Sequence, residues 1–457
     1  MRPCRANPVF VGAVLYVVIF AVSRLLLEGF SQRPPSGLKL SVLSTDFHIS
    51  PIRDLKDIMR RMPEFSSVSV VDESFSGHCK MTGTCARKLR VLNPENGISL
   101  GDCPNQLKQE FWREYHQDKW MVGMDMYICH HAVALCEVYL PFDRPIVIVS
   151  TTRYELGRHD ANSWARLNQA LTAIAAKEFN TVAANSVYDV EYLRHFTGIE
   201  NVLLLPSLCA YVDSYYLPTK KEFLVGPSRL SNGGNKIFEG AGGLLESLLT
   251  SNLSDELSFK RIRELYPHYS FKDLAAHPAI VIIPYQVSIM SLFEYYAIGI
   301  PLFVPSLELL VQWQIKYLLL DELSWNCVFG RCDEKSAIVA HPNSPHRGTD
   351  PNDILNTDNL RYWLKFADFY QWPGVLFFES WSDLFHQVQH TDFAVVSRTM
   401  MNFNAEKYLR VRRAWLEIFR RARGKTAATA DKFEDSWAGS ILRTYPELDE
   451  DILLSEC

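Results

Sequence analysis

The sequence lacks both the spacing of a structural metal site and the charge of a nucleic-acid-binding protein. None of its ten cysteines forms a Cys-x2-Cys pair, so the ligand spacing of a zinc finger is missing. Its 47 Lys and Arg residues are outnumbered by 52 Asp and Glu residues, and a net charge of -5 provides no general positive field. We therefore expect neither a bound metal nor a nucleic-acid partner.

Long hydrophobic runs are few, and one with the length of a membrane span lies near the N-terminus. Pro8 to Leu27 is interrupted only by Ser23 and Arg24, which gives roughly the ~20 residues that a bilayer requires. Arg2 and Arg5 precede this run, which favours a cytosolic N-terminus and a lumenal body. We expect an uncleaved type II anchor in the Golgi membrane. The alternative is a cleaved signal peptide, because Ala21-Val22-Ser23 has the small-x-small form of a cleavage site.

The cysteines and one asparagine fit a lumenal environment. Cys79, Cys85 and Cys103 cluster in a loop-rich region, and Cys327 and Cys332 flank a short turn. Either group is suited to a disulfide in an oxidising compartment, although the sequence does not determine the connectivity. The triplet that begins at Asn252 is a glycosylation acceptor sequence.

The stretch from His277 to Ser306 predicts one strand-helix-strand unit. Ala279 to Ile283 is an unbroken apolar run between prolines, which indicates a strand buried on both faces of a parallel sheet. Ser288 is a good N-cap for a helix through Ile298, and Gly299 supplies its left-handed end. Ligands in open α/β sheets bind beyond the carboxyl ends of such strands, at helix N-termini.

Three residues of this unit carry a resemblance to a known family. Glu294, Gly299 and Pro301 form a Glu-x4-Gly-x-Pro pattern after a strand and a turn. This pattern resembles the donor-site signature of GT-B glycosyltransferases, especially the retaining, glycogen-synthase-like branch. The resemblance implies that Glu294 contacts the nucleotide ribose, whereas the family's first glutamate falls on Gln286, which keeps the length and loses the charge. A strand, a helix and a Gly-x-Pro turn also occur in α/β proteins of other functions.

The same resemblance implies a site for a nucleotide diphosphate. In the family, an arginine after the first strand of the C-terminal domain and a later lysine neutralise the diphosphate, and Arg229 and Lys236 are the matching positions. A fixed guanidinium and ammonium would stabilise the charge that develops on the leaving group without a metal. The alternative is a Gly-rich surface loop with two solvated cations. No permanently bound cofactor is expected, and the nucleotide sugar is the donor substrate.

Strands and helices alternate along the chain, which predicts an α/β fold with parallel sheets. With the resemblance, this implies two Rossmann-like domains that face each other across a cleft, behind an N-terminal transmembrane helix. The expected divisions are a cytosolic tail at 1–7, the anchor at 8–27, a stem at 28–37, an N-terminal acceptor domain at 38–206, a linker at 207–221, a C-terminal donor domain at 222–400, and a C-terminal helix with an acidic tail at 401–457.

Candidate catalytic residues lie on the N-terminal domain. His130 and His131 follow a predicted strand from Val122 to Cys129, and a histidine with a pKa near neutrality can deprotonate an acceptor hydroxyl. Glu155 lies between two arginines in the loop from Thr151 to Arg158, which we place on the acceptor side or between the domains. The alternatives are packed histidines and a solvated loop.

We expect a glycosyltransferase that moves a sugar from a nucleotide sugar to a glycan or glycoconjugate in the secretory-pathway lumen. The sequence leaves open the donor, the acceptor and the stereochemistry. One alternative is a lumenal carbohydrate-binding or scaffold protein that has the same fold and has lost transfer. Another is a secreted α/β protein of unrelated function.

Overall fold

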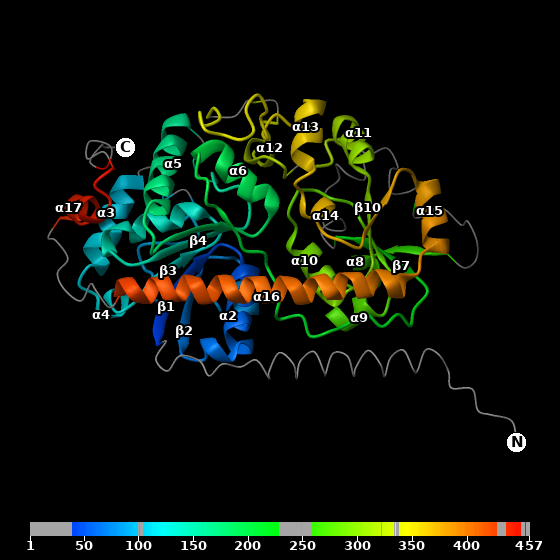
Figure 1. The fold of residues 1–457 in the computed structure, drawn as a ribbon, viewed down its shortest axis with the longest axis horizontal. Helices are drawn as coiled ribbons and strands as arrows, with labels where there is room; N and C mark the ends of the chain where they lie inside the picture. Colours follow the sequence, from blue (N-terminus) through cyan, green and yellow to red (C-terminus); the bar gives the residue numbers. More distant parts are fainter. Residues whose placement is uncertain are drawn as a thin grey trace, which may run out of the picture.

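Two parallel β-sheets, one in each half of the chain, organise the protein (Figure 1). The computed structural model describes residues 39–98, 100, 104–156, 158, 160–227, 248, 257–320, 322–332, 334, 338–426, 436–448 and 453. The predicted anchor at 8–27 and the predicted glycosylation triplet at Asn252 lie outside these ranges. Within them, no helix has the length and apolar character needed to cross a bilayer.

The first sheet has six strands in the order β2-β1-β3-β4-β5-β6, and every neighbouring pair is parallel. Apolar side chains from both of its faces are buried, as expected for a parallel sheet covered by helices on each side. The strands are β1 Leu40–Asp46, β2 Val68–Ser74, β3 Met126–Cys129, β4 Ile146–Ser150, β5 Thr181–Ala184 and β6 Leu203–Leu204.

Helices flank this sheet on both sides. In Figure 1, α5 and α6 lie on one side, and α2 lies on the other. The helices of this half are α2 Ile49–Arg61, η1 Pro63–Phe65, η2 Cys79–Met81, α3 Pro104–Tyr115, α4 Lys119–Val122, η3 Val133–Phe142, α5 Ala161–Ala175 and α6 Val187–Thr197.

The second sheet has five parallel strands in the order β11-β10-β9-β7-β8. Its strands are β7 Phe223–Gly226, β8 Phe259–Arg261, β9 Ile280–Ile282, β10 Leu302–Pro305 and β11 Val375–Phe378. Its helices are α8 Ile262–Leu265, α9 Phe271–Ala275, α10 Met290–Ile298, α11 Leu307–Tyr317, α12 Trp325–Val328, α13 Thr357–Leu364, α14 Asp368–Gln371 and α15 Trp381–His390.

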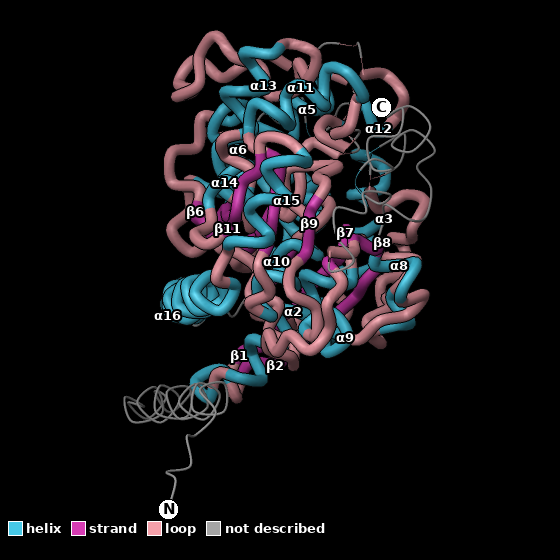
Figure 2. Tube along the Cα trace, turned by 90° about the vertical axis from the view of Figure 1, so that its right-hand side faces the viewer, coloured by secondary structure: helices cyan, strands magenta, loops and turns pink. Residues whose placement is uncertain are grey.

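A single long helix, α16 Phe393–Thr426, runs beside both halves (Figures 1 and 2). Near the second sheet, Asn404 donates to the carbonyl of Tyr296 on α10 at 2.8 Å. Near the first sheet, Phe419 packs edge-on against Phe65, with 5.3 Å between ring centroids, and Arg412 pairs with Glu64. The short helix α17 Trp437–Thr444 follows and packs against η3. The helix α16 is therefore part of the packing of both halves.

Local side-chain chemistry explains two departures from the predicted elements. The strand before His130 begins only at Met126, because Asp118 accepts hydrogen bonds from the backbone of Trp120 and Met121 and caps the short helix α4. The N-cap of α10 is Ile289, so the prediction of a Ser288 cap is wrong. The Ser288 hydroxyl instead donates to Asp368 at 2.9 Å.

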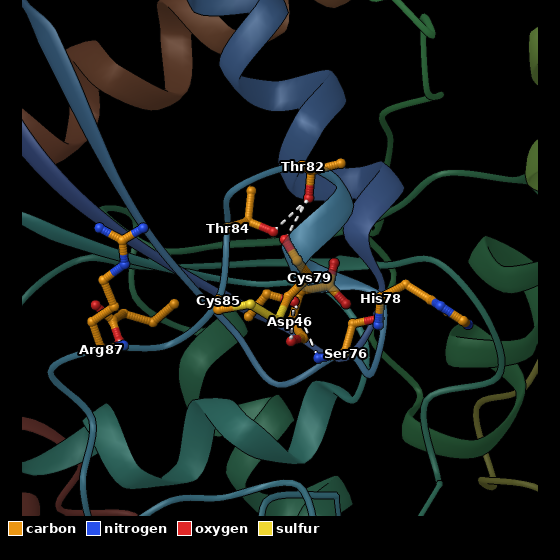
Figure 3. The surroundings of a disulfide bond; sticks show 10 residues. Asp46, Ser76, His78, Cys79, Thr82, Thr84, Cys85 and Arg87 are labelled. Atoms are coloured by element: carbon orange, nitrogen blue, oxygen red, sulfur yellow. Dashed lines mark hydrogen bonds between the residues drawn. A yellow bond between two sulfur atoms is a disulfide. The ribbon is translucent and has the colours of Figure 1, made fainter. Parts of the chain in front are cut away.

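Three disulfides lie within the described residues. Cys79–Cys85 and Cys327–Cys332 confirm the expectation of bonds in those two regions, whereas Cys129–Cys136 was not anticipated. Figure 3 shows the first of these beside a turn in which the hydroxyls of Thr82 and Thr84 lie 2.8 Å apart. Cys103 lies outside the described residues.

Candidate functional site

Each sheet has one point at which the strand order reverses. In the first sheet the chain proceeds outward from β1 to β2 and then returns to β3 on the other side of β1. In the second sheet it proceeds from β7 to β8 and returns to β9. Ligands of open α/β sheets bind beyond the carboxyl ends of the strands at such points. Ligand-binding side chains are therefore expected in the segments after β1, β3, β7 and β9.

The carboxyl edges of the two sheets meet through Arg153, which follows β4. Its side chain is 1% exposed, and its Nη1 donates to Oε1 of Gln286, after β9, at 3.2 Å. Its Nη2 donates to the carbonyl of Glu322, and its guanidinium lies 5.4 Å from the ring centroid of Trp325 on α12. Trp325 Nε1 in turn donates to the Arg153 carbonyl at 2.9 Å. Arg153 thus connects the first half to three segments of the second.

The two adjacent histidines after β3 face different surroundings, because successive side chains of an extended chain point to opposite sides. His131 packs between His48, at 4.6 Å between ring centroids, and Trp325, at 5.8 Å. Burial, with smaller effects of His48 and Arg153, holds the pKa of His131 well below its usual value. The imidazole of His131 is therefore neutral near pH 7, and His48 beside it is exposed.

His130 faces a pocket under α2 and α16 instead. Its side chain is 3% exposed, and neither ring nitrogen has a hydrogen-bond partner. Burial lowers the pKa of His130 to about 3, so its imidazole is also neutral. The predicted histidine pair therefore consists of one residue at the contact between the sheets and one that lines a separate pocket.

Glu155 lies at the contact between the two halves. Its Oε1 accepts a hydrogen bond of 2.9 Å from the hydroxyl of Tyr192 on α6, and that hydroxyl accepts one of 2.8 Å from Nδ2 of Asn352. The other carboxyl oxygen, Oε2, is buried without a partner. Burial raises the pKa of Glu155 to about 7, although backbone contact and Arg153 act in the opposite direction. Sequence reasoning missed Tyr192 and Asn352, because no local pattern marks residues 160 positions apart.

The predicted donor-site residues lie on the second half. Gln286 follows β9 and bonds Arg153, and Glu294 lies on α10. Glu294 accepts a hydrogen bond of 2.7 Å from the hydroxyl of Tyr211 in the connecting segment between the sheets. Burial raises the pKa of Glu294 to about 7. Arg229 and Lys236, the predicted phosphate ligands, lie outside the described residues.

Buried polar atoms without hydrogen-bond partners gather at the carboxyl edge of the first sheet. They belong to residues at or just after the ends of β1, β3, β4 and β5, namely Ser44, Asp46, His130, Thr151, Arg153, Glu155, Asn185, Tyr188 and Asp189. An unpaired buried donor or acceptor costs about 1–3 kcal/mol unless water or a ligand satisfies it. The edge is therefore suited to a polar ligand. Within the described residues, no group of His, Cys, Asp and Glu side chains could hold a metal ion.

The topology decides the fold. Two all-parallel sheets, each with one reversal of strand order, meet at their carboxyl edges, and a C-terminal helix runs along both. This arrangement fits the GT-B fold. This confirms the predicted α/β arrangement of two Rossmann-like sheets.

Comparison with known proteins gives structural matches alone. No protein-family model matches the sequence, and no curated protein sequence matches it. The chain is similar to a solved structure of the spinosyn rhamnosyltransferase SpnG complexed with thymidine diphosphate, with 9% identity, coverage of 82% of this chain and 99% of that chain, and a TM-score of 0.36. It is also similar to MurG of Acinetobacter baumannii (8% identity, 90% and 100% coverage, TM-score 0.33). A third match is the S. aureus MnaA-UDP co-structure (12% identity, 58% and 79% coverage, TM-score 0.34). Matches with these identities and TM-scores do not show the activity of this chain.

Proposed function

We propose that this GT-B chain transfers a sugar from a nucleotide sugar to a glycan or glycoconjugate hydroxyl. The observation that carries the proposal is the gathering of unpartnered buried polar atoms at the carboxyl edge of the first sheet, where Arg153 meets Gln286 of the second. A folded protein retains such unsatisfied groups where a ligand or ordered water completes their hydrogen bonds. A hydroxyl-rich acceptor next to a polar donor would do so.

The donor is expected to bind the second half. Arg229 and Lys236 would neutralise the diphosphate, and Glu294 would bond the ribose from α10. Gln286 would lie near the sugar, with its amide nitrogen available to a hydroxyl while its oxygen is held by Arg153. No metal is required for this arrangement, because the two cations supply the positive charge.

The acceptor is expected to bind the first half. In the transfer step, the acceptor oxygen forms a bond to the anomeric carbon, and the bond from that carbon to the phosphate oxygen breaks with its electron pair leaving on the nucleotide. The acceptor proton goes to a base. His130, His131 and Glu155 are the predicted candidates. Burial lowers the pKa of both histidines well below neutrality, so neither has the near-neutral pKa expected of a base. Glu155 has an unpartnered Oε2 and a pKa raised to about 7, so it is the better candidate.

We place the enzyme in the Golgi membrane as a type II protein anchored by residues 8–27. The disulfides support an oxidising compartment, since such bonds are rare in reducing ones. The anchor is tested by intact mass, because removal of residues 1–23 would indicate a cleaved signal peptide instead.

A second function is favoured by one residue. Gln286 replaces the first glutamate of the resembled signature, and loss of that carboxylate fits a lumenal carbohydrate-binding or scaffold protein that no longer transfers sugar. Binding of a nucleotide sugar without turnover would support this alternative.

The test is a panel of UDP-, GDP- and CMP-sugars, presented to the purified full-length chain in detergent. We expect one of them to bind and to be turned over. Arg229→Ala should weaken that binding by about 10- to 100-fold, as expected when charge-assisted hydrogen bonds are lost. Arg60→Ala is the control, since this side chain is largely exposed. Absence of binding by every donor would contradict the transferase.

A further inference from the structure

A segment of the second half lies on a helix of the first half. Residues 341–352, between α12 and α13, form a strap against α6 (Figure 1). The Ser344 hydroxyl of the strap lies 2.9 Å from Nδ1 of His195. Nε2 of His346 lies 2.7 Å from a carboxyl oxygen of Glu191. The strap therefore bonds α6 at two separate turns.

Asn352 lies at the end of the strap, and both halves fix its position. Its backbone N–H donates to Oδ1 of Asp350 at 2.9 Å, which closes a turn. On the side of the second half, Nε1 of Trp363 on α13 donates to the Thr349 hydroxyl at 3.0 Å. The Asn352 side chain is buried, and its Nδ2 donates to the hydroxyl of Tyr192 on α6 at 2.8 Å. The second half thus holds an amide against a hydroxyl of the first.

The single proton of the Tyr192 hydroxyl has two acceptors within reach. Oε1 of Glu155 lies at 2.9 Å, and Oδ1 of Asn352 lies at 3.0 Å. An ionised carboxylate is a stronger acceptor than a neutral amide, so the tyrosine proton points to Glu155 while that residue is charged. Once Glu155 is protonated, this preference is lost and the amide oxygen can accept the bond. In the charged state, Oε1 is therefore occupied, and Oε2 has no partner.

We propose that Tyr192 and Asn352 are positioning residues for Glu155, which hold Oε1 so that Oε2 receives the proton of the acceptor hydroxyl. This inference rests on the proposed function, because it takes Glu155 as the base. The proton moves from the acceptor oxygen to Oε2, and no bond at Tyr192 or Asn352 other than a hydrogen bond changes. Since Asn352 belongs to the half expected to bind the donor, the base is fully oriented only when the two halves are in contact.

The first variant is Tyr192→Phe, which removes the hydroxyl and keeps the ring. The bond from Tyr192 lowers the pKa of Glu155, so its loss should raise that pKa from about 7. We expect an upward shift of about 1 pH unit, as for a hydrogen bond to a charged group. The measurement is an NMR titration of the full-length chain with isotope-labelled glutamate carboxyl carbons. The Glu155 signal is identified by its absence in Glu155→Gln.

The matched control is Ser344→Ala. This substitution removes another bond between the strap and α6, but Ser344 contacts His195 and not Tyr192 or Glu155. The pKa of Glu155 should stay unchanged in this variant. No shift in Tyr192→Phe, or an equal shift in Ser344→Ala, overturns the proposal.

The second variant is Asn352→Asp. It replaces the amide by a charged acceptor that draws the tyrosine proton away from Glu155, and its charge also opposes ionisation of Glu155. Both effects raise the pKa of Glu155, but only the first requires the tyrosine hydroxyl. We therefore expect roughly half or more of the shift to disappear in the Tyr192→Phe background. A shift that survives in full assigns the effect to charge alone and overturns the role of Asn352.

The pH dependence of kcat separates this inference from the proposed function. With a donor that is turned over, the rise of kcat with pH should move upward in Tyr192→Phe by the same amount as the pKa of Glu155. If the pKa of Glu155 moves and this rise does not, Glu155 is not the base, and the inference fails while transfer stands. If the unmodified chain turns over no donor, the proposed function fails, and the titration still decides whether Tyr192 and Asn352 hold Glu155.

Discussion

Arg153 donates a hydrogen bond of 3.2 Å to Gln286, across the contact between the two sheets. An amide oxygen at this position accepts the bond without adding a third buried carboxylate to a region that already contains Glu155 and Asp189. Burial raises the pKa of these two carboxyls to about 7 and about 6. The departure of Gln286 from the resembled signature thus has a structural role in this chain.

The first prediction concerns that bond. Gln286→Leu removes the acceptor at similar volume and leaves another nitrogen of the buried Arg153 unpaired, in addition to Nε. The free energy of unfolding should fall by about 1–3 kcal/mol. Urea unfolding measures it, with Gln117→Leu as an exposed control that should change stability by less than about 0.5 kcal/mol. Equal effects of the two substitutions would show that the bond contributes nothing.

The second prediction concerns pH and Glu155. Its pKa is about 7 in the folded chain against an ordinary 4.5, so between these values the folded state holds a proton that the unfolded chain releases. The contribution of Glu155 to stability is therefore greatest below pH 4.5 and declines as pH rises to 7. Glu155→Gln should reduce the decline between pH 4.5 and pH 8 by about 3 kcal/mol. The measurement is urea unfolding across this range, with exposed Glu95→Gln as control. If the dependence of stability on pH is unchanged in Glu155→Gln, the raised pKa of Glu155 is contradicted.

The third prediction concerns Lys407 on α16. Its ammonium is buried without a hydrogen-bond partner, 4.5 Å from the ring centroid of Trp372, and burial lowers its pKa to about 8 from 10.5. The folded chain therefore releases this proton at lower pH than the unfolded chain. The free energy of unfolding thus gains a contribution from Lys407 that increases as pH rises from 8 towards 10.5. Lys407→Met should abolish that contribution in unfolding measured at pH 8 and pH 10, whereas exposed Lys80→Met should preserve it. If the increase in stability between pH 8 and pH 10 persists in Lys407→Met, it arises from other titratable groups.

The fourth prediction concerns cysteine pairing. Peptide mapping without reduction should recover Cys129 linked to Cys136 and Cys327 linked to Cys332. Cys209 is a buried free thiol and should react with an alkylating reagent only after unfolding. Alkylation of Cys129 in the native protein would refute the pairing and remove one support for a lumenal location.

The sequence alone predicted the helices and strands that have strong local signals. The strand-helix-strand unit around Gly299 forms as predicted, with the glycine in the left-handed conformation at a φ of 78°, because apolar runs bounded by prolines and a helix-ending glycine act locally. By contrast, β8 is only three residues long and contains Lys260 and Arg261, so it has no hydrophobic pattern to detect.

The site was less accessible to sequence reasoning, because its contacts join distant segments. Arg153 and Gln286 are 133 positions apart, and Tyr192 and Asn352 are 160 apart. The charged composition of their loop was enough to select Arg153 and Glu155 as candidate site residues, but it could not identify their partners. The opposite orientations of His130 and His131 likewise depend on where β3 ends, and the predicted strand began four residues early. The predicted donor roles of Arg229 and Lys236 remain predictions.

The long helix α16 has a consequence for how the protein is made. Phe419 and Trp415 complete an apolar layer with Leu55 and Phe65, which are synthesised some 350 residues earlier. While translation continues, that layer is open to solvent. The half of the protein that leaves the ribosome first is thus the last to close its core, and a nascent chain that stops before residue 411 exposes an apolar surface for chaperones to recognise.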